Sequence, residues 1–506
     1  MKKHALTLGM LALLIGCGQD DPGSATATDD PGREPATVEP TDPRREPATV
    51  EPTDPSRDQA RRAQEATVEP TDPSREPATV DPLCPTPAVC RGKPCFMGQR
   101  CDPDRGCTPR IVTTRSFSAD TLSLVFDVTG QGGIALAGSY NKPASDPADP
   151  LDVQALVARL TPNGEMKWSR SFGEAGLAEQ ATKLRIDAER NLWVAGIFQG
   201  PILRHGGLEA TGHGDDDVFV FKLMGEGKPL WLQALGGAGD DQVFDLDVGE
   251  EGNGYLLTGG DRGEHDSFTL TRIRPDGSKG WARQLPGTTP TLGLYQDDQF
   301  YLAATFTAPT VKVLWQEVGR REGDETGIWL ARMDWDGDLV WALALDGDGA
   351  ARRIQDIIAM KDGDLVIAGF GALDGFPATD GEGRMFAARL SPAGTPEQIW
   401  RFGPPPGSPG PTDVTLVLGR NDRVHLGGGF SGPFHWGGIT PRPDLEEGRF
   451  TGTIETDGAF GEILMTDGSG AAYPPRMARD DAARVYLISD RADGEDEGFR
   501  LLTIAP

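Results

Sequence analysis

The chain has 506 residues, a formal net charge of −28, 67 glycines and ten tryptophans. This acidity argues against a nucleic-acid-binding protein, because phosphates need Lys and Arg, and against adsorption to an anionic lipid surface. The glycines and tryptophans, without a long helical period, favour short strands joined by tight turns. We therefore expect a soluble, monomeric, all-β protein that does not bind nucleic acid.

Residues 1–16 have the pattern of an export signal. Two lysines precede an apolar run over residues 6–15, which is too short to span a bilayer as a mature helix. The run ends in Leu-Ile-Gly-Cys17, which resembles the bacterial lipoprotein signal at every position. The resemblance implies cleavage before Cys17, lipid on its thiol, and a place in the cell envelope. Gly18 favours the outer over the inner membrane. The alternative is an ordinary signal peptide with an unmodified cysteine.

Residues 17–83 contain a Pro-rich repeat in which Ala-Thr-Val begins at positions 36, 48, 66 and 78. Proline removes amide donors and disfavours helix at the preceding residue. The stretch has no aromatic residue to bury, so we expect a disordered tether, partly polyproline II. At about 3.1 Å per residue it reaches on the order of 200 Å. A repeat expansion without a selected length is the alternative.

Residues 84–109 form a small cysteine-rich segment with Cys84, Cys90, Cys95, Cys101 and Cys107. So short a segment cannot bury a core of its own, and an exported chain can form disulfides. The spacings lack CxxC pairs and no His lies nearby, which weakens a zinc site. Residues 95–107 loosely resemble short EGF-like modules. Five cysteines predict two disulfides and one free or intermolecular thiol, with the connectivity open.

A recurring stretch dominates the remaining chain. Residues 160–168 end a strand, turn on Asn-Gly and open a new strand with Trp, and the pattern returns at 223–231, 273–281, 333–341 and 390–400, with a worn copy from 454. A unit that repeats about every 50–64 residues indicates a propeller or an array. The tryptophans share one strand position, so we expect core contacts between blades rather than a ligand cage: Trp168, Trp231, Trp281, Trp341 and Trp400.

Each unit can be divided into strands. Seven apolar runs that end at a small residue are predicted second strands: 134–138, 192–196, 255–259, 300–304, 365–369, 424–428 and 485–489. Seven alternating runs are predicted third strands: 153–160, 217–223, 267–273, 327–333, 384–390, 449–454 and 498–504. First strands precede them, as at 183–187, 243–247 and 414–418.

A fourth strand follows only six of the third strands. Residues 111–117 contain the Arg-Ser-Phe of 166–172, which suggests that they supply the missing strand. We therefore expect 111–117 to pair with 498–504 and to close a seven-bladed β-propeller over residues 110–506. Closure removes the open sheet edge that invites aggregation.

The repeat resembles the bacterial β-propeller repeat family of cell-surface proteins and, more distantly, quinoprotein-type propeller repeats. The resemblance rests on the Gly-Gly-x-Gly-Asp-Asp run at 236–241, the strand at 191–196, the Gly-Gly hairpins at 206–208 and 437–439, and the turn followed by Trp. It implies the fold and a surface location but no ligand. Three blades depart from the pattern, because Ala304 replaces a Gly in the fourth and the last two lack the Trp.

Candidate binding residues lie in the long segments 199–216, 307–326 and 431–448, on the face opposite the short turns. Variable loops on a rigid scaffold usually carry binding. Basic and aromatic side chains there suit an anion, a glycan or a protein partner. They are Arg204, His205, Trp315, Arg320, Arg321, His435 and Trp436. The alternative is a set of solvated loops with ordinary packing at the rim.

The sequence predicts no catalytic residue, no metal ligand and no cofactor. It lacks HExxH, GxSxG, P-loop and CxxC patterns, and none of its six histidines is paired at ligand spacing. Calcium is an alternative only: in 334–338 Gly is fourth, whereas an EF-hand needs it sixth, and 215–217 and 346–348 are equally loose.

These features together predict a lipid-anchored envelope protein that presents a non-catalytic propeller to bind or scaffold a protein or glycan. Two alternatives remain. One is a propeller enzyme, a glycan hydrolase or lyase, which needs two carboxylates roughly 5–9 Å apart. The other is an envelope-assembly factor.

Overall fold

The structure is a computed structural model that describes residues 89–90, 93–94, 99–102, 106–109, 111–118 and 121–504, apart from 143–151, 174–176, 261–265, 296–298, 348–351, 377–382, 406–407, 409, 420–421, 442–444, 468–476, 481–483 and 491–497. The chain divides into two units, Met1–Asp81 and Pro82–Pro506. The predicted signal, Cys17, the tether, Cys84 and Cys95 lie outside the described residues. No helix among the described residues is long and apolar enough to cross a membrane.

The cysteine-rich segment forms two short hairpins. Strand β1 (Val89–Cys90) pairs with β2 (Lys93–Pro94), and β3 (Gln99–Asp102) pairs with β4 (Gly106–Pro109). Cys101 and Cys107 are Cα partners in the second hairpin. The predicted disulfides stay a prediction.

The remaining chain is an all-β propeller of four-stranded antiparallel sheets. The first sheet holds β6 (Thr121–Val128), β7 (Ile134–Lys142), β8 (Asp152–Leu160) and β9 (Met166–Phe172). The second holds β10 (Glu179–Ile186), β11 (Leu192–Gln199), β14 (Asp216–Leu223) and β15 (Pro229–Leu235). The third holds β16 (Asp241–Val248), β17 (Gly254–Gly260), β18 (Ser267–Ile273) and β19 (Lys279–Pro286). The fourth holds β20 (Thr288–Tyr295), β21 (Gln299–Phe306), β24 (Gly327–Asp334) and β25 (Leu339–Leu345).

Three further sheets continue the series. The fifth holds β26 (Arg353–Ala359), β27 (Leu365–Phe370), β28 (Met385–Leu390) and β29 (Pro396–Phe402). The sixth holds β30 (Gly410–Leu418), β31 (Val424–Ser431), β32 (Glu447–Ile454) and β33 (Phe460–Asp467). The seventh joins β34 (Met477–Arg479), β35 (Val485–Asp490) and β36 (Gly498–Ile504) to β5 (Ile111–Ser118). Hairpins β12 (Ile202–His205)–β13 (Leu208–Thr211) and β22 (Thr310–Val313)–β23 (Gln316–Gly319) are separate.

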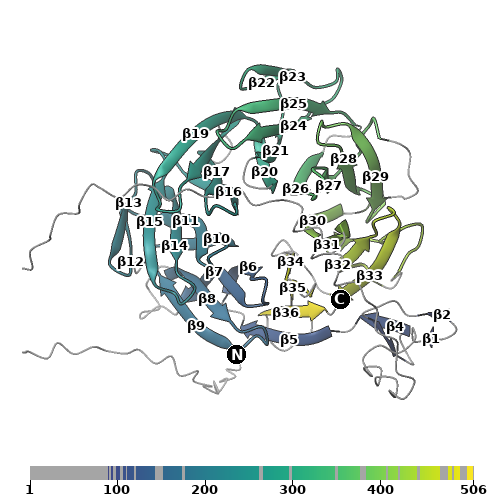
Figure 1. Ribbon diagram of the computed structural model, residues 1–506, viewed down its shortest axis with the longest axis horizontal. Helices are drawn as coiled ribbons and strands as arrows, with labels where there is room; N and C mark the ends of the chain where they lie inside the picture. Colours follow the sequence, from purple (N-terminus) through teal and green to yellow (C-terminus); the bar gives the residue numbers. More distant parts are fainter. Residues whose placement is uncertain are drawn as a thin grey trace, which may run out of the picture. The chain divides into compact units, whose positions relative to one another are not determined.

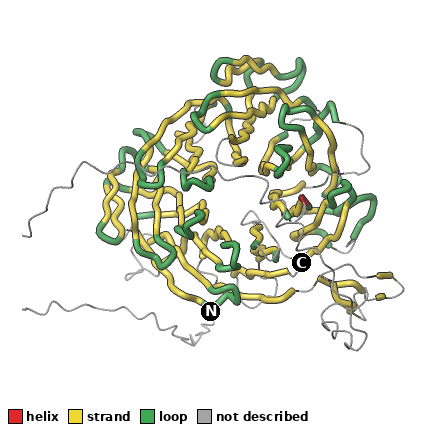
Figure 2. Tube along the Cα trace, viewed as in Figure 1, coloured by secondary structure: helices red, strands yellow, loops and turns green. Residues whose placement is uncertain are grey.

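The sheets stand around a central axis with their first strands innermost (Figure 1). Six of them use consecutive stretches of chain, and the seventh is composite. In that sheet β5 pairs with β36 in a register that places Phe117 opposite Phe499, as the Arg-Ser-Phe match predicted. Figure 2 shows that strands and their connecting loops make up nearly all of the described part of the ring.

The core lies between neighbouring sheets. Three apolar clusters join the first sheet to the second, the third to the fourth, and the fifth to the sixth. Three others join the fourth sheet to the fifth, the second to the third, and the seventh to the first. The second strands supply buried small residues that let the sheets approach, among them Ala135, Ala137 and Ala195. This packing explains why the second strands of the sequence are apolar and end at a small residue.

At the outer rim, each of five tryptophans donates its Nε1–H to a main-chain oxygen in a turn of the next sheet: Trp168 to Gly225 (3.0 Å), Trp231 to Pro275 (2.9 Å), Trp281 to Trp335 (3.0 Å), Trp341 to Pro392 (3.1 Å) and Trp400 to Gly458 (2.7 Å). These contacts confirm their predicted role between blades. Only Trp400 is fully buried, at 4% exposed, and the other four are half-buried.

The turn glycine of the next sheet is needed for this contact. Gly277 has φ of 86°, and a Cβ there would lie 2.7 Å from the ring of Trp231. Gly227, Gly337 and Gly394 meet the preceding tryptophan in the same way, at 2.9–3.1 Å. Glycine therefore satisfies both the left-handed turn and the close approach of the indole.

Candidate functional site

The innermost strands surround a central cavity of about 500 Å³. Its charged lining carries both signs: Asp127, Asp245, Asp247, Asp356 and Asp413 with Lys183, Arg185, Arg353 and Arg479. Thr291, Thr415 and Gln355 add uncharged polar groups. Clefts with a few converging polar groups are the usual place for a ligand, so this cavity is the candidate site.

An innermost strand is a sheet edge, and its inward N–H groups have no partner strand. Three aspartates of the cavity supply acceptors across the gap between sheets. Oδ2 of Asp127 accepts the N–H of Ile186 (2.8 Å) in β10, and Oδ2 of Asp356 accepts the N–H of Leu416 (2.7 Å) in β30. Each aspartate also accepts the N–H of the residue that follows it, at 2.8–2.9 Å.

Asp245 makes the corresponding contact between the third and fourth sheets. Its Oδ2 accepts the N–H of Leu292 (3.2 Å), and its Oδ1 accepts the N–H of Leu246 (3.0 Å). We call Asp127, Asp245 and Asp356, with these bonds, the carboxylate clamps. They occur where the first sheet meets the second, the third meets the fourth, and the fifth meets the sixth.

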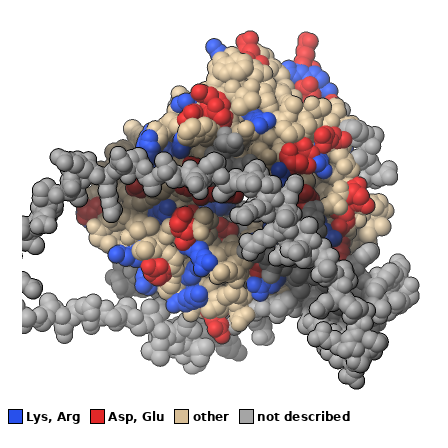
Figure 3. All heavy atoms as spheres, viewed as in Figure 1, with Lys and Arg blue, Asp and Glu red and all other residues tan. Residues whose placement is uncertain are grey.

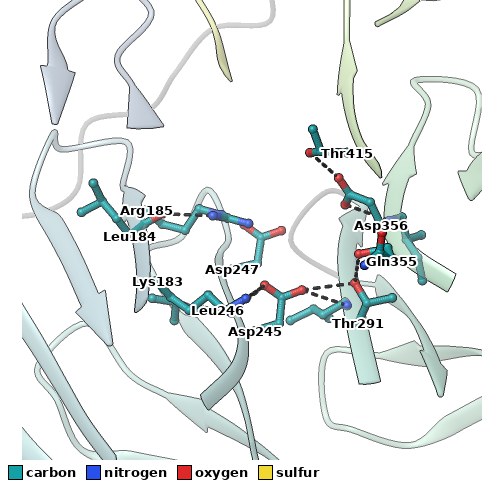
Figure 4. Close-up of polar contacts among 12 residues, drawn as sticks. Lys183, Leu184, Arg185, Asp245, Leu246, Asp247, Thr291, Gln355, Asp356 and Thr415 are labelled. Carbon is teal, nitrogen blue, oxygen red and sulfur yellow. Dashed lines mark hydrogen bonds and ion pairs between the residues drawn. The ribbon is translucent and has the colours of Figure 1, made fainter. Parts of the chain in front are cut away.

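Between the second and third sheets, ion pairs replace the clamp. Arg185 Nε lies 3.2 Å from Asp247 Oδ1, and Lys183 Nζ lies 3.9 Å from Asp245 Oδ1. Figure 4 shows Arg185 and Asp247 on one side of the cavity and Asp356 with Thr415 on the other. Thr291, in the fourth sheet, donates to the main-chain oxygen of Gln355 (3.2 Å) in the fifth. Neighbouring innermost strands from β6 to β30 are therefore all linked.

Burial changes the acidity of these carboxyl groups. It raises the pKa of Asp356 to about 6, although hydrogen bonds from Leu416 and Thr415 act in the opposite direction. It also raises the pKa values of Asp127 and Asp247, against the opposing charge of Arg185. Burial alone lowers the pKa of Arg185, but Asp247 and Asp245 outweigh it and raise that pKa. The aspartates are therefore held in place by hydrogen bonds and partly neutralised by one guanidinium.

This arrangement favours structural and recognition roles over proton transfer. Each clamp carboxylate already accepts main-chain N–H groups with both of its oxygens, and movement of a clamp would break bonds between sheets. No group of three or more His, Cys, Asp or Glu side chains within the described part of the chain is placed to hold a metal ion. The cavity offers donors and acceptors side by side on walls that the fold keeps rigid.

The predicted binding residues lie elsewhere, on the outer hairpins. In β12–β13, Leu203 is buried in the cluster that joins the first two sheets. Arg204, on the opposite side of the strand, pairs with Glu209 at 2.8 Å and is exposed. The ring of His205 packs against those of Phe172 and Phe221, with centroid distances of 5.1 and 5.0 Å, and burial lowers its pKa. The hairpin therefore covers the joint between two sheets and presents the Arg204–Glu209 ion pair to solvent.

The second hairpin, β22–β23, covers the joint between the third and fourth sheets in the same way, with Val313 and Val318 buried. Trp315 stands at its tip and is 64% exposed. Arg320 donates to the main-chain oxygen of Thr307 (3.0 Å), and Arg321 pairs with Asp374 (2.7 Å). Both arginines hold loop segments together.

The last two predicted residues, His435 and Trp436, follow β31. Trp436 is 1% exposed, packs against Phe402 and Phe450, and donates its Nε1–H to Gly461 (3.1 Å). This burial corrects its placement on a binding surface, because the ring fills the joint between the fifth and sixth sheets. His435 exchanges main-chain hydrogen bonds with Gly403.

The seven predicted residues thus lie in segments inserted into the second, fourth and sixth sheets and do not form one site. Sequence reasoning missed the cavity residues, although each clamp is an aspartate followed by an apolar residue, and two of them follow a Val-Phe pair: Asp127, Asp245 and Asp356.

The Gly-Gly hairpins are confirmed: Gly206 and Gly207 have φ of 56° and 83°, and Gly437 and Gly438 have 56° and 80°. Both pairs suit a tight two-residue turn. Acidic and basic groups are interspersed on the face in Figure 3.

No family model and no curated protein matches the chain. Similar solved structures include a protein of unknown function from Dyadobacter fermentans, with a TM-score of 0.39, 14% identity, and 81% of this chain and 100% of that chain covered. An ulvan lyase of polysaccharide lyase family PL25 has a TM-score of 0.41, 12% identity and coverages of 77% and 96%. An α-L-arabinanase from Penicillium chrysogenum has a TM-score of 0.38, 12% identity and coverages of 78% and 99%.

Proposed function

We propose that the chain is a lipid-anchored protein of the bacterial cell envelope whose seven-bladed propeller binds a polar partner without catalysing a reaction. The observation that carries the non-catalytic part is the engagement of the clamp carboxylates. A glycan hydrolase needs one carboxyl group to give a proton and another to attack or to activate water. In this cavity Asp127, Asp245 and Asp356 use both oxygens to hold neighbouring strands.

The lining favours a glycan over a singly charged ligand. Asp, Arg, Lys and Thr side chains line the cavity, and donors lie beside acceptors, as Arg185 lies beside Asp247 and Lys183 beside Asp245. Sugar hydroxyl groups both donate and accept, and they match such a wall better than an isolated charge does. Arg479 lines the cavity and is half-buried, which makes it the best side chain with which to probe binding.

The test uses the full chain and a panel of fluorescent glycan fragments, including acidic ones. Binding is followed by polarisation, and cleavage by the appearance of new reducing ends. We expect saturable binding that Arg479→Ala weakens at least about tenfold, with no cleavage. Arg204→Ala, on an outer hairpin, is the control and should bind as wild type does.

Two results would overturn this proposal. New reducing ends in the wild-type reaction would establish an enzyme. Binding that depends on Arg204 rather than on Arg479 would move the partner to the outer hairpins, as first expected from the sequence.

Attachment to the membrane is tested separately. Cys17→Ser should abolish incorporation of a labelled fatty acid and release the chain from the membrane fraction. Labelling that persists in this variant would contradict the anchor.

A glycan-active enzyme is the second candidate, and one observation favours it. Burial raises the pKa of Asp356 to about 6, close to the range in which a carboxyl group serves as a general acid. If this candidate is correct, Asp356→Asn loses cleavage by at least about a hundredfold while glycan binding persists. The absence of any cleavage by wild type would count against it.

A further inference from the structure

The Gly-Gly-Ala-Gly-Asp-Asp run at 236–241 connects β15 to β16, between the second and third sheets. It packs against residues 212–214, which precede β14. A Cβ on Gly214 would lie 2.5 Å from the main-chain oxygen of Gly239 and 2.9 Å from that of Gly237. The two loops, 212–214 and 236–241, are therefore in close contact, and main-chain oxygens of the second loop face the first.

Asp217 lies beneath these loops and is 0% exposed. Its Oδ2 accepts the N–H groups of His213 (2.7 Å) and Gly214 (3.0 Å). Its Oδ1 is buried and has no hydrogen-bond partner among the residues that the structure describes. A buried carboxylate oxygen without a partner is costly, because it has lost its hydration without compensation.

The Oδ1 of Asp217 points to the space in front of Gly236, where Oδ2 of Asp241 also lies. A Cβ on Gly236 would be 2.4 Å from the Asp217 oxygen and 2.6 Å from the Asp241 oxygen. Since both distances are measured to one point, the two oxygens are at most 5.0 Å apart. Asp241 Oδ2 is held there by the N–H of Gly237 at 2.6 Å. Two carboxylates this close repel each other unless a cation lies between them.

We propose that Asp217 and Asp241 bind a calcium ion in front of Gly236. Calcium takes oxygen ligands at about 2.3–2.6 Å, so two oxygens on one ion lie no more than about 5 Å apart. Magnesium needs about 2.0–2.1 Å and a stricter octahedron. No described group of three acidic, His or Cys side chains surrounds a common point, so main-chain oxygens and water complete the shell. Glycine at 236 leaves the room that a side chain would fill.

The preceding sheet shows what makes this place different. In the first sheet the last pair between the third and fourth strands is Ala155 with Phe172, and in the second sheet it is Val218 with Leu235. The residues just before Ala155 and Val218, Gln154 and Asp217, therefore occupy corresponding positions. Glu179 begins β10 as Asp241 begins β16. An amide and a carboxylate thus occupy positions where the second sheet brings two carboxylates. The proposal therefore distinguishes this joint from the preceding one, and it does not depend on the function of the central cavity.

The experiment titrates calcium chloride into the full chain, after treatment with a chelator, in a calorimeter and in thermal unfolding. Wild type should show saturable binding and a rise of several degrees in the unfolding temperature, because a ligand that binds only the folded state stabilises it. Asp217→Asn should weaken binding at least about tenfold, since charge count sets calcium affinity. Asp215→Asn, an exposed carboxylate in the same Asp run, is the matched control and should bind as wild type does.

Three results would overturn the proposal. They are no saturable binding to wild type, unchanged binding to Asp217→Asn, or equal affinity for magnesium. If Asp217→Asn does not fold, Asp241→Asn gives the same readout from the other ligand. Gly236→Ala, which keeps both carboxylates and fills the space, should also lose the ion.

Discussion

The outer rim and the centre of the ring join their sheets in different ways. At the rim one contact recurs five times, from a tryptophan Nε1–H to a turn of the next sheet. At the centre the contacts change from joint to joint, between carboxylate clamps, ion pairs and a threonine bond. The repeated contact sets the geometry of the ring, whereas the varied one gives the cavity its individual charge pattern.

The carboxylate clamps occur at alternate joints of the ring, although apolar clusters also join the second sheet to the third, the fourth to the fifth and the seventh to the first. The carboxylate clamps link the first sheet to the second, the third to the fourth and the fifth to the sixth. The outer hairpins β12–β13 and β22–β23 cover the first two of these joints, and Trp436 fills the third. Hairpins chosen from sequence as binding loops therefore have a structural reason to exist.

Removal of a rim tryptophan should give the largest effect on stability. Trp400 is almost fully buried, so Trp400→Ala should lower the free energy of unfolding by about 3–5 kcal/mol. Trp231 is half-buried and makes the same hydrogen bond, so Trp231→Ala should cost about half as much. Urea unfolding of both variants measures the difference. Equal losses would mean that the hydrogen bond, and not burial, dominates the contact.

A turn glycine should rank next. Gly277→Ala combines a φ of 86° with a methyl group 2.7 Å from Trp231, and should cost about 2–3 kcal/mol. Gly438 has a similar φ of 80° with no atom within 4 Å of its Cβ position, so Gly438→Ala isolates the backbone strain at about 1 kcal/mol. Thermal unfolding distinguishes them. A Gly438→Ala loss as large as that of Gly277→Ala would refute the role of the indole.

A clamp should show itself in the pH dependence of stability. The pKa of Asp356 is about 6 in the folded state against 3.8 for an unperturbed carboxyl group. A raised carboxyl pKa stabilises the fold below the unfolded value and loses this contribution as the pH rises through the folded value. Between about pH 4 and 6, wild type should therefore lose about 1–2 kcal/mol relative to Asp356→Asn. If the free energy of unfolding changed with pH in the same way in both proteins, the raised pKa of Asp356 would be contradicted.

The exposed tip of an outer hairpin should matter least. Trp315 is 64% exposed, and Trp315→Ser should change the free energy of unfolding by less than about 0.5 kcal/mol. Val313→Ser, on the buried side of the same hairpin, is the comparison and should cost several times more. A large loss from Trp315→Ser would show that the tip, and not only the underside, supports the joint.

Much of the fold could be predicted because it repeats. The turn before each tryptophan, the apolar second strands and the Arg-Ser-Phe match at 115–117 are local patterns, and they located the strands and the pairing of β5 with β36. The candidate site could not be found in this way. Asp127 and Asp245 share a preceding Val-Phe pair that Asp356 lacks. The three are far apart in sequence, and only the closing of the ring brings them to one cavity.

The sequence also could not predict which side chains of the long segments are exposed at the surface. Trp436 and Trp315 both occur in long segments rich in glycine and charge, yet one is buried and the other exposed. The difference comes from the side of the hairpin on which each ring stands, which depends on packing against the outer strands. The signal, Cys17 and the tether remain expectations from sequence.

The measurement that tests the carboxylate clamps most directly is amide hydrogen exchange at the inner strands. The N–H groups of Ile186, Leu292 and Leu416 face away from their own sheets and depend on Asp127, Asp245 and Asp356. We expect slow exchange at all three in wild type, and faster exchange at Leu416 alone in Asp356→Ala. Exchange at Leu416 that is equally fast in wild type and in Asp356→Ala would show that this carboxylate holds no neighbouring strand.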